Sequence, residues 1–153
     1  MKDLIEFKQE SYADCIDDLM PLVELHYDEL SRDKDIPLSP RHERYIELDN
    51  NNLLRLYTIR QNKKLIGYAA FFVGHNLHYE TSYQAVQDVL FIEPKFRGGI
   101  GRQFIPWCDE QLKKIGVQKV MHHVKEDICD FSPLLFKLGY VRSDVIYTRR
   151  LDQ

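Results

Sequence analysis

The stretch from residue 88 to residue 115 constrains the fold more than any other part of this chain. It holds an apolar run at residues 89–92, a Glu93-Pro94 break, a glycine-rich loop at 96–102 and an amphipathic segment. This order predicts a strand, a turn and the start of a helix. Gly98, Gly99 and Gly101 allow positive φ and close backbone approach, and the first amides of a helix attract anions. The sequence therefore predicts a phosphate-binding turn.

The residues around the loop exclude two common nucleotide sites. A nucleotide P-loop carries Lys and Ser or Thr directly after its last glycine, whereas Arg102 and Gln103 follow Gly101 here. A dinucleotide fingerprint needs a third glycine where Phe104 stands and an acidic residue at the end of the next strand, where the chain has Lys125. Neither a GTPase or kinase loop nor a Rossmann site is favoured.

A later segment adds a second mark, Leu134-Leu135-Phe136-Lys137-Leu138-Gly139-Tyr140. With the strand, loop and helix before it, this segment resembles the acetyl-CoA site of the GNAT acetyltransferase superfamily, closely over residues 88–140 and more loosely elsewhere. The resemblance implies an α/β (α+β) fold with a mixed, mostly antiparallel twisted sheet of about six to seven strands and about four flanking helices. It also implies a single domain over residues 1–153, with acetyl-CoA as co-substrate.

The resemblance places acetyl-CoA along the strand, the loop and the start of the last helix. The residues in those places are Leu90, Phe91, Ile92, Arg97, Gly98, Gly99, Ile100, Gly101, Arg102 and Ser132. Backbone N–H groups near Ile92 would stabilise the developing oxyanion. Phe96 stands where the family has Arg or Gln, so the loop is one residue short. Leu135 stands where many members have a tyrosine that protonates the departing thiolate, so another group or water must do so here.

Three residues are candidates for acid–base chemistry. Asp88 lies at the start of the apolar strand, where a desolvated carboxylate could take a proton from an ammonium group. His78 titrates near neutral pH, and Tyr79 offers a phenolic donor in the preceding loop. The simpler interpretations are a strand-end Asp bonded to backbone and an ordinary surface-loop histidine.

Residues after the next strand add weaker candidates. His122 and His123 alternate on that strand, so one of them faces the thiol region and could replace the missing tyrosine. Cys129 follows, although a buried structural cysteine is the simpler interpretation. Asp130 and Ser132 are predicted to cap the last helix. The three cysteines have no metal-binding spacing, so the sequence predicts no metal site.

Hydrophobic periodicity predicts the remaining elements. Strands are expected at residues 4–8, 53–59, 64–73, 117–124 and 145–151, with Gly74 ending the third, and helices at 11–30, 101–115 and 132–138. Ser39 is predicted to cap a further helix that runs through Tyr45. The chain has 153 residues, 44% of them hydrophobic, which supports one domain with a sizeable core.

Charge is split unevenly along the chain and bears on partners. Residues 1–50 have a net charge of −8 and residues 51–153 a net charge of +5. This split favours a polyanionic cofactor on one side and a cationic amine on the other, although a solvated acidic helix face explains the acidic half equally well. The acidic half disfavours nucleic acid. No membrane-length apolar run or signal-type segment occurs, so we expect a cytoplasmic location without a membrane partner. A homodimer is compatible with the sequence.

Two functions follow from the sequence. The first is an acetyl-CoA-dependent N-acetyltransferase that acts on a primary amine of a small molecule or protein. The second is a catalytically inactive module of GNAT fold that binds CoA or a protein partner. The glycine loop and the His78, Tyr79 and Asp88 group favour the first, whereas Leu135 and the shortened loop favour the second.

Overall fold

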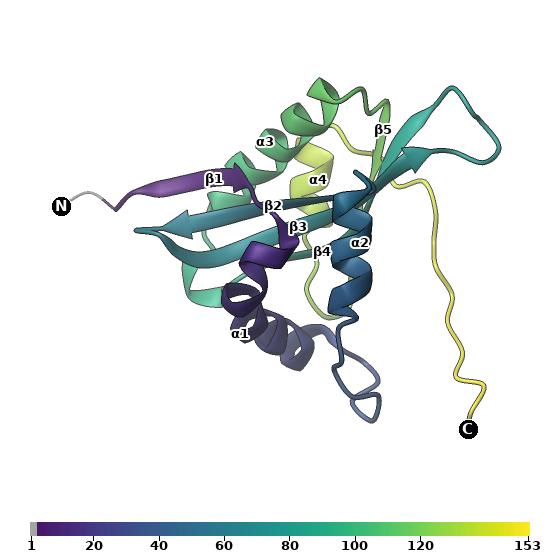
Figure 1. Ribbon diagram of the computed structural model, residues 1–153. Helices are drawn as coiled ribbons and strands as arrows, with labels where there is room; N and C mark the ends of the chain where they lie inside the picture. The colour runs from purple at the N-terminus through teal and green to yellow at the C-terminus, as the bar shows by residue number, and fades with distance from the viewer. Residues whose placement is uncertain (1–2) are drawn as a thin grey trace.

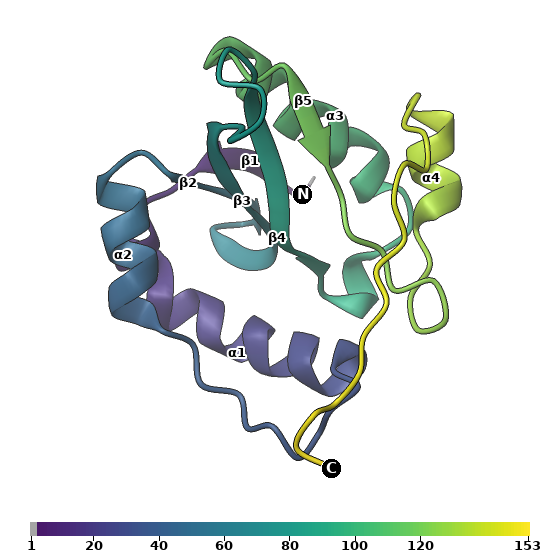
Figure 2. The ribbon, with the colours of Figure 1, turned by 90° about the vertical axis from the view of Figure 1, so that its right-hand side faces the viewer.

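One five-stranded sheet with helices on both faces makes up the computed structural model, which describes residues 3–153 (Figures 1 and 2). The strands are β1 (Ile5–Gln9), β2 (Leu54–Gln61), β3 (Lys64–His75), β4 (Tyr83–Ile92) and β5 (Lys119–Met121). The helices are α1 (Tyr12–Leu30), α2 (His42–Asn50), α3 (Ile100–Lys114) and α4 (Ser132–Lys137), and a 3-10 turn, η1, covers Pro94–Phe96. Strand order follows the sequence, and only the β4–β5 pair is parallel. The α+β class is confirmed, with fewer strands than the six to seven expected.

The first helix forms as its sequence predicts. Ser11 caps α1 by accepting a hydrogen bond from the Asp14 amide, and the helix continues through Pro21. The predicted cap of α2 is wrong. The amides of the first turn bond to the Arg41 carbonyl, so α2 begins after Arg41, whereas Ser39 remains in the preceding loop.

Two hydrophobic clusters fill the two faces of the sheet. Tyr12, Leu19 and other α1 residues pack on one face, against β2, β3 and α2. Phe104, Cys108 and other α3 residues pack on the opposite face. Each strand alternates its side chains between these clusters, so both faces of the central strands are buried. The α1–α2 layer is therefore separated from the α3 layer by the sheet.

Several sequence-based boundaries differ from the structure, among them the start of β4, which is Tyr83 and not Asp88. The strand expected at 145–151 does not form, since this part of the chain is extended but unpaired, with Tyr147 91% exposed. β5 has three residues rather than the eight expected, so it offers little edge for a further strand. Gly74 does not end β3, because the ladder with β4 continues to His75. No helix in the described chain is long and apolar enough to span a membrane.

Candidate active site

A β-bulge in the middle of β4 sets the position of Asp88. Val89 pairs with Ala70 and Gln87 pairs with Phe71, so Asp88 is the extra residue on β4. Asp88 thus lies in the middle of β4, whereas the sequence predicted it at the start of the strand. Its carboxylate faces α2, and the next residue, Val89, packs against the α1–α2 cluster. The bulge therefore presents two successive residues to the same face.

An aromatic network holds the Asp88 carboxylate. The Tyr45 hydroxyl of α2 donates to Asp88 Oδ2 at 2.6 Å. The Tyr12 ring stacks on Tyr45 at 4.8 Å between centroids, and its hydroxyl bonds His42 Nδ1 at 2.7 Å. Burial, together with the Asp88 carboxylate, raises the pKa of Tyr45 above its usual value, so this phenol stays protonated as a donor at neutral pH.

Beyond the bulge, β4 has an unpaired edge. β4 pairs with β5 only from Gln84 to Val86, and Figure 2 shows the two chains diverging after that point. The Glu93 amide donates to Ile66 of β3, so by the alternation of an antiparallel ladder the backbone groups of Ile92 and Leu90 point the other way. The Ile92 carbonyl points away from β3, since it accepts a hydrogen bond from Arg97 Nε at 2.8 Å. Among the described residues nothing accepts from these two amides, so an extended ligand could do so.

The glycine loop joins this edge to α3. Gly98 and Gly99 have φ of +126° and +124°, as the sequence predicted, whereas Gly101 lies in the first helical turn. A Cβ on Gly98 or Gly99 would meet nothing within 4 Å, so their backbone is open to a ligand. No acidic residue occupies the first turn of α3. The free amides and the positive dipole end therefore face outward together.

The Arg97 side chain points back to α1. Its two terminal nitrogens bond the Glu29 carboxylate at 2.8 Å each, and the guanidinium lies over the Phe91 ring. The Arg97 guanidinium holds the pKa of Glu29 below its usual range. Arg97 therefore ties the loop to α1. Arg102 is exposed and forms no ion pair with any residue in the described range 3–153.

Ser132 and Leu135 of α4 lie in different environments, one at the start of the helix and one in the core. Ser132 is the first residue of α4, and its hydroxyl and amide both donate to Asp130 Oδ1. The N-cap position is Phe131, without a side-chain cap bond. Leu135 is buried at 6% exposure, so an apolar side chain occupies the position expected for an acid.

His122 lies on the α3 side of the sheet. Its Nδ1 bonds the Gln87 side-chain oxygen at 2.7 Å, and its ring packs against Phe71 and Tyr140. Burial lowers the pKa of His122 to about 4, so the ring is neutral at pH 7. Its Nε2 is buried and has no partner in the described chain, whereas His123 is exposed.

The structure does not bring the predicted loop residues to Asp88. His78 and Tyr79 lie in the exposed β3–β4 hairpin, which extends beyond the body of the protein (Figure 1). Their amides donate to Asn76 Oδ1. Within residues 3–153, no hydrogen bond joins either residue to Asp88, and their catalytic role stays a prediction.

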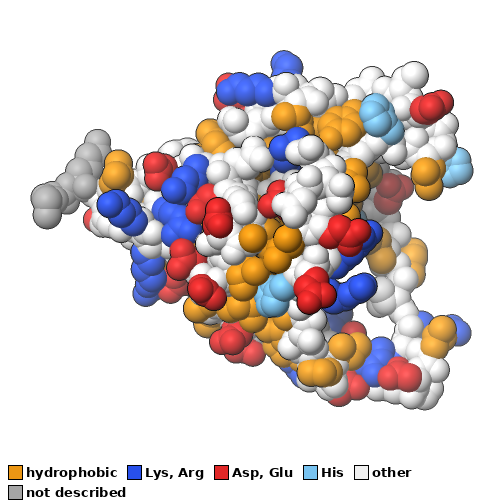
Figure 3. Space-filling model, in the orientation of Figure 1, with side chains coloured by type: hydrophobic (Ala, Val, Ile, Leu, Met, Phe, Trp, Pro, Cys, Tyr) orange, Lys and Arg blue, Asp and Glu red, His pale blue; other side chains and the backbone are white. Residues whose placement is uncertain are grey.

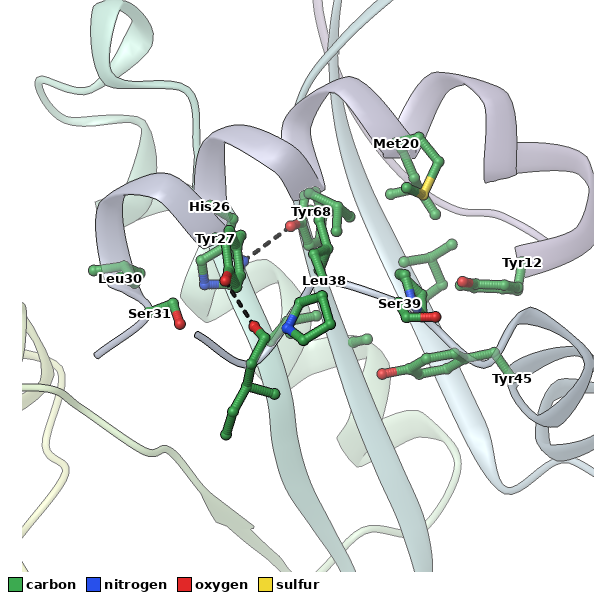
Figure 4. A pocket seen from close by; sticks show the side chains of 18 of the residues that line it. Tyr12, Met20, His26, Tyr27, Leu30, Ser31, Leu38, Ser39, Tyr45 and Tyr68 are labelled. Atoms are coloured by element: carbon green, nitrogen blue, oxygen red, sulfur yellow. Dashed lines mark hydrogen bonds between the residues drawn. The ribbon is translucent and has the colours of Figure 1, made fainter. Parts of the chain in front are cut away.

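A cavity of about 440 Å³ lies between α1, the loop after it, and β3 and β4 (Figure 4). Its walls include Tyr12, Tyr45, Tyr68, His26, Leu38, Val89 and Lys125. His26 Nδ1 and the Tyr68 hydroxyl form a hydrogen bond of 3.0 Å, and the His26 ring stacks on Phe91. Burial lowers the pKa of His26 to about 4. None of these lining residues was predicted from the sequence as part of a site. The sequence signal for these lining residues is the occurrence of tyrosine and histidine on the apolar faces of α1 and α2.

No family model and no curated protein matches the chain in sequence. Solved structures do match in shape. A transcriptional regulator from Bacillus halodurans is 19% identical, with 97% of this chain and 100% of that chain covered and a TM-score of 0.76. An aminoglycoside acetyltransferase from an uncultured soil sample, in complex with sisomicin, is 18% identical over 96% of each chain, with a TM-score of 0.72.

A predicted acetyltransferase from Clostridium acetobutylicum, solved with acetyl-CoA, is 16% identical over 97% of each chain, with a TM-score of 0.70. Identities this low show the fold and not the activity. The likeness spans nearly the whole length of each protein and includes the strand–loop–helix element from β4 to α3. The chain has the fold of the GNAT N-acetyltransferase superfamily.

Proposed function

We propose that the protein is an acetyl-CoA-dependent N-acetyltransferase that acts on a primary amine of a small molecule or protein. The observation that carries this proposal is the β4 bulge. It puts Asp88 beside the cavity on one face, while the unpaired β4 edge continues into the glycine loop on the other side of the site. An amine site and a cofactor site therefore meet at one strand.

The cofactor residues fit acetyl-CoA by the chemistry of their donors. The outward amides of Leu90 and Ile92 suit the amide groups of pantetheine, which would add to β4 like a strand. The amides from Gly98 to Gly101 suit the pyrophosphate. The path of the cofactor is lined by Phe91, Arg97, Ile100 and Ser132. The exposed Arg102 supplies a positive charge beside it. In the described chain no cluster of metal-ligating side chains occurs, and the proposed reaction uses none.

Acetyl-CoA supplies the acetyl group as a thioester. The Asp88 carboxylate, held by Tyr45, accepts a proton from the ammonium form of the acceptor. The neutral nitrogen then attacks the thioester carbonyl, so that an N–C bond forms, the C–S bond breaks and the nitrogen loses its second proton to solvent. We assign stabilisation of the oxyanion to the Ile92 amide, which points away from β3. The thiolate takes its proton from solvent, since Leu135 offers none.

Loss of cofactor binding on Gly99→Glu tests the cofactor site. Gly116→Glu is the matched control, because both glycines have positive φ and open space where a Cβ would lie, and Gly116 follows the other end of α3. Acetyl-CoA at about 100 times its dissociation constant should stabilise the fold by about 2.7 kcal/mol in a thermal-shift titration. We expect that shift in the wild type and in Gly116→Glu only. No shift at millimolar ligand would refute the proposal.

A panel of amines distinguishes catalysis from binding alone. Release of free CoA with an amine supports the enzyme, whereas acetyl-CoA binding without release across the panel supports an inactive module. The free thiols of Cys15, Cys108 and Cys129 suit a reducing compartment, so we place the activity in the cytoplasm. A homodimer stays a prediction, which light scattering can measure.

A further inference from the structure

The cavity beside Asp88 has an unusual lining for a site that receives a cation. It follows one face of α1, which carries Leu19, Met20, Val23, His26 and Leu30. Between the first and last of these residues α1 rises about 16 Å. The facing wall adds Leu38 and Val89. The lining is thus an elongated apolar and aromatic surface.

One end of this cavity carries the acid–base group. Tyr45 lies at that end, with its hydroxyl directed toward the middle of the cavity in Figure 4 and bonded to Asp88. The Asp88 carboxylate lies behind this hydroxyl, next to the lining and not within it, so an ammonium group at this end would approach the carboxylate past Tyr45. This end therefore accommodates one positive charge.

The other end does not accommodate a second positive charge. Among the described residues that line the cavity, Asp33 is the one carboxylate, and it contacts Arg150 at 3.2 Å, a guanidinium that Asp35 and Asp152 also contact. Lys125 lies at the same end and donates to the Leu30 carbonyl at 2.7 Å. A second ammonium group of a ligand would face Lys125, and the one lining carboxylate there already contacts a guanidinium, so the added charge would be poorly compensated.

The outer surface of the α1–α2 layer also carries apolar side chains. Figure 3 shows hydrophobic side chains gathered over α1 and α2, with acidic and basic side chains around them. His26 is neutral at pH 7, so it adds an aromatic face without a charge. Tyr27 ties the loop after α1 to the helix, since its hydroxyl donates to the Lys34 and Ile36 carbonyls.

We propose that the acceptor is a primary monoamine attached to an apolar body, aromatic or aliphatic, which lies along α1 while its amine reaches Asp88. This inference rests on the proposed function, because it names the substrate class of the same site. A volume of about 440 Å³ suits a body the size of a small drug. Polyamines and aminoglycosides are then poor substrates, since their further ammonium groups remain unpaired.

Two amines of equal length test the charge rule. Octylamine and 1,8-diaminooctane differ at one end only, where the second carries another ammonium group. We expect kcat/KM for octylamine, and for 4-phenylbutylamine, to exceed that for 1,8-diaminooctane by about tenfold or more, because of the unpaired charge. Sisomicin should give no CoA release above background. Equal or faster turnover of 1,8-diaminooctane or sisomicin would overturn the inference.

Direct binding separates this inference from the proposed function. Calorimetry with 4-phenylbutylamine and protein free of acetyl-CoA should detect binding that Met20→Trp weakens by about tenfold, since the larger ring fills the cavity. Glu24→Trp, one turn along α1 and exposed, is the matched control and should bind as wild type does. Leu38→Lys tests the opposite wall should Met20→Trp fail to fold.

The possible results are distinct. Amine binding without acetyl-CoA binding refutes the proposed enzyme but leaves the apolar site. Acetyl-CoA binding with sisomicin turnover refutes the apolar site but leaves the enzyme. Binding of 4-phenylbutylamine that is equal in Met20→Trp and Glu24→Trp also overturns the inference.

Discussion

Asp88 faces the cavity side because β4 carries one residue more than β3 opposite it. The strand run and the acidic residue are visible in the sequence, but the bulge depends on pairing with β3, which sequence alone does not specify. The same holds for Tyr45, which lies 43 positions before Asp88. Sequence reasoning thus found the carboxylate and missed the group that holds it.

We expect Asp88→Asn to lower kcat by about two to four orders of magnitude, because the amide cannot accept the ammonium proton. Acetyl-CoA affinity should stay unchanged, since the glycine loop is untouched. Steady-state kinetics and calorimetry measure the two quantities. Asp17→Asn, at an exposed site on α1, serves as the control. Full activity of Asp88→Asn would remove this residue from the mechanism.

The buried histidines make stability depend on pH. Burial lowers the pKa of His122 and of His26 from 6.5 to about 4, so the unfolded chain binds protons more readily than the folded protein. Stability is therefore greatest above pH 6.5 and falls as the pH drops toward 4, by up to about 1.4 kcal/mol per pH unit for each histidine. Urea unfolding over this range should show the loss.

His122→Gln isolates one of these contributions. The variant has no titrating ring at that position, so its unfolding free energy should fall less steeply between pH 6.5 and 4 than that of the wild type. An identical slope in variant and wild type would show that His122 keeps its ordinary pKa in the folded protein.

At the scale of elements, the glycine loop can be tested through its tie to α1. Glu29→Gln weakens the paired hydrogen bonds to Arg97, which hold the loop at the edge of β4. If Arg97 acts by positioning the loop, acetyl-CoA affinity should fall several-fold, with roughly tenfold corresponding to about 1.4 kcal/mol. Calorimetry measures the affinity, with Glu24→Gln on the exposed face of α1 as control. Tighter binding would instead mean that the freed guanidinium contacts phosphate.

Elements defined by local signals were predictable, and those that depend on distant partners were not. The glycine loop, α1 and the β2–β3 hairpin follow from caps, periodicity and turn residues. Residues 145–151 begin with β-branched and aromatic residues, which favour a strand, but no strand of the described chain pairs with them, and β5 ends at Met121. A favourable composition gives a strand only where a ladder partner exists.

At the scale of the whole molecule, the cavity is assembled from segments far apart in the sequence. Tyr12 and Tyr45 come from the first fifty residues, Tyr68 from β3, and Lys125 from the loop after β5. None carries a motif, so their meeting could be seen only in the fold. The charge asymmetry, in contrast, was visible at once, and it leads to a prediction that concerns both substrates.

Salt should affect the two substrates differently. Residues 51–153 have a net charge of +5, and acetyl-CoA is a polyanion, so its dissociation constant should rise between about 0.05 M and 0.5 M NaCl as screening shortens the range of the field. An apolar monoamine binds mainly by burial of its body, so its KM should change by less than about twofold. Calorimetry for the first and initial rates at saturating acetyl-CoA for the second provide the comparison. A parallel rise in both would mean that the net charge of −8 in residues 1–50, and not the apolar cavity, attracts the amine.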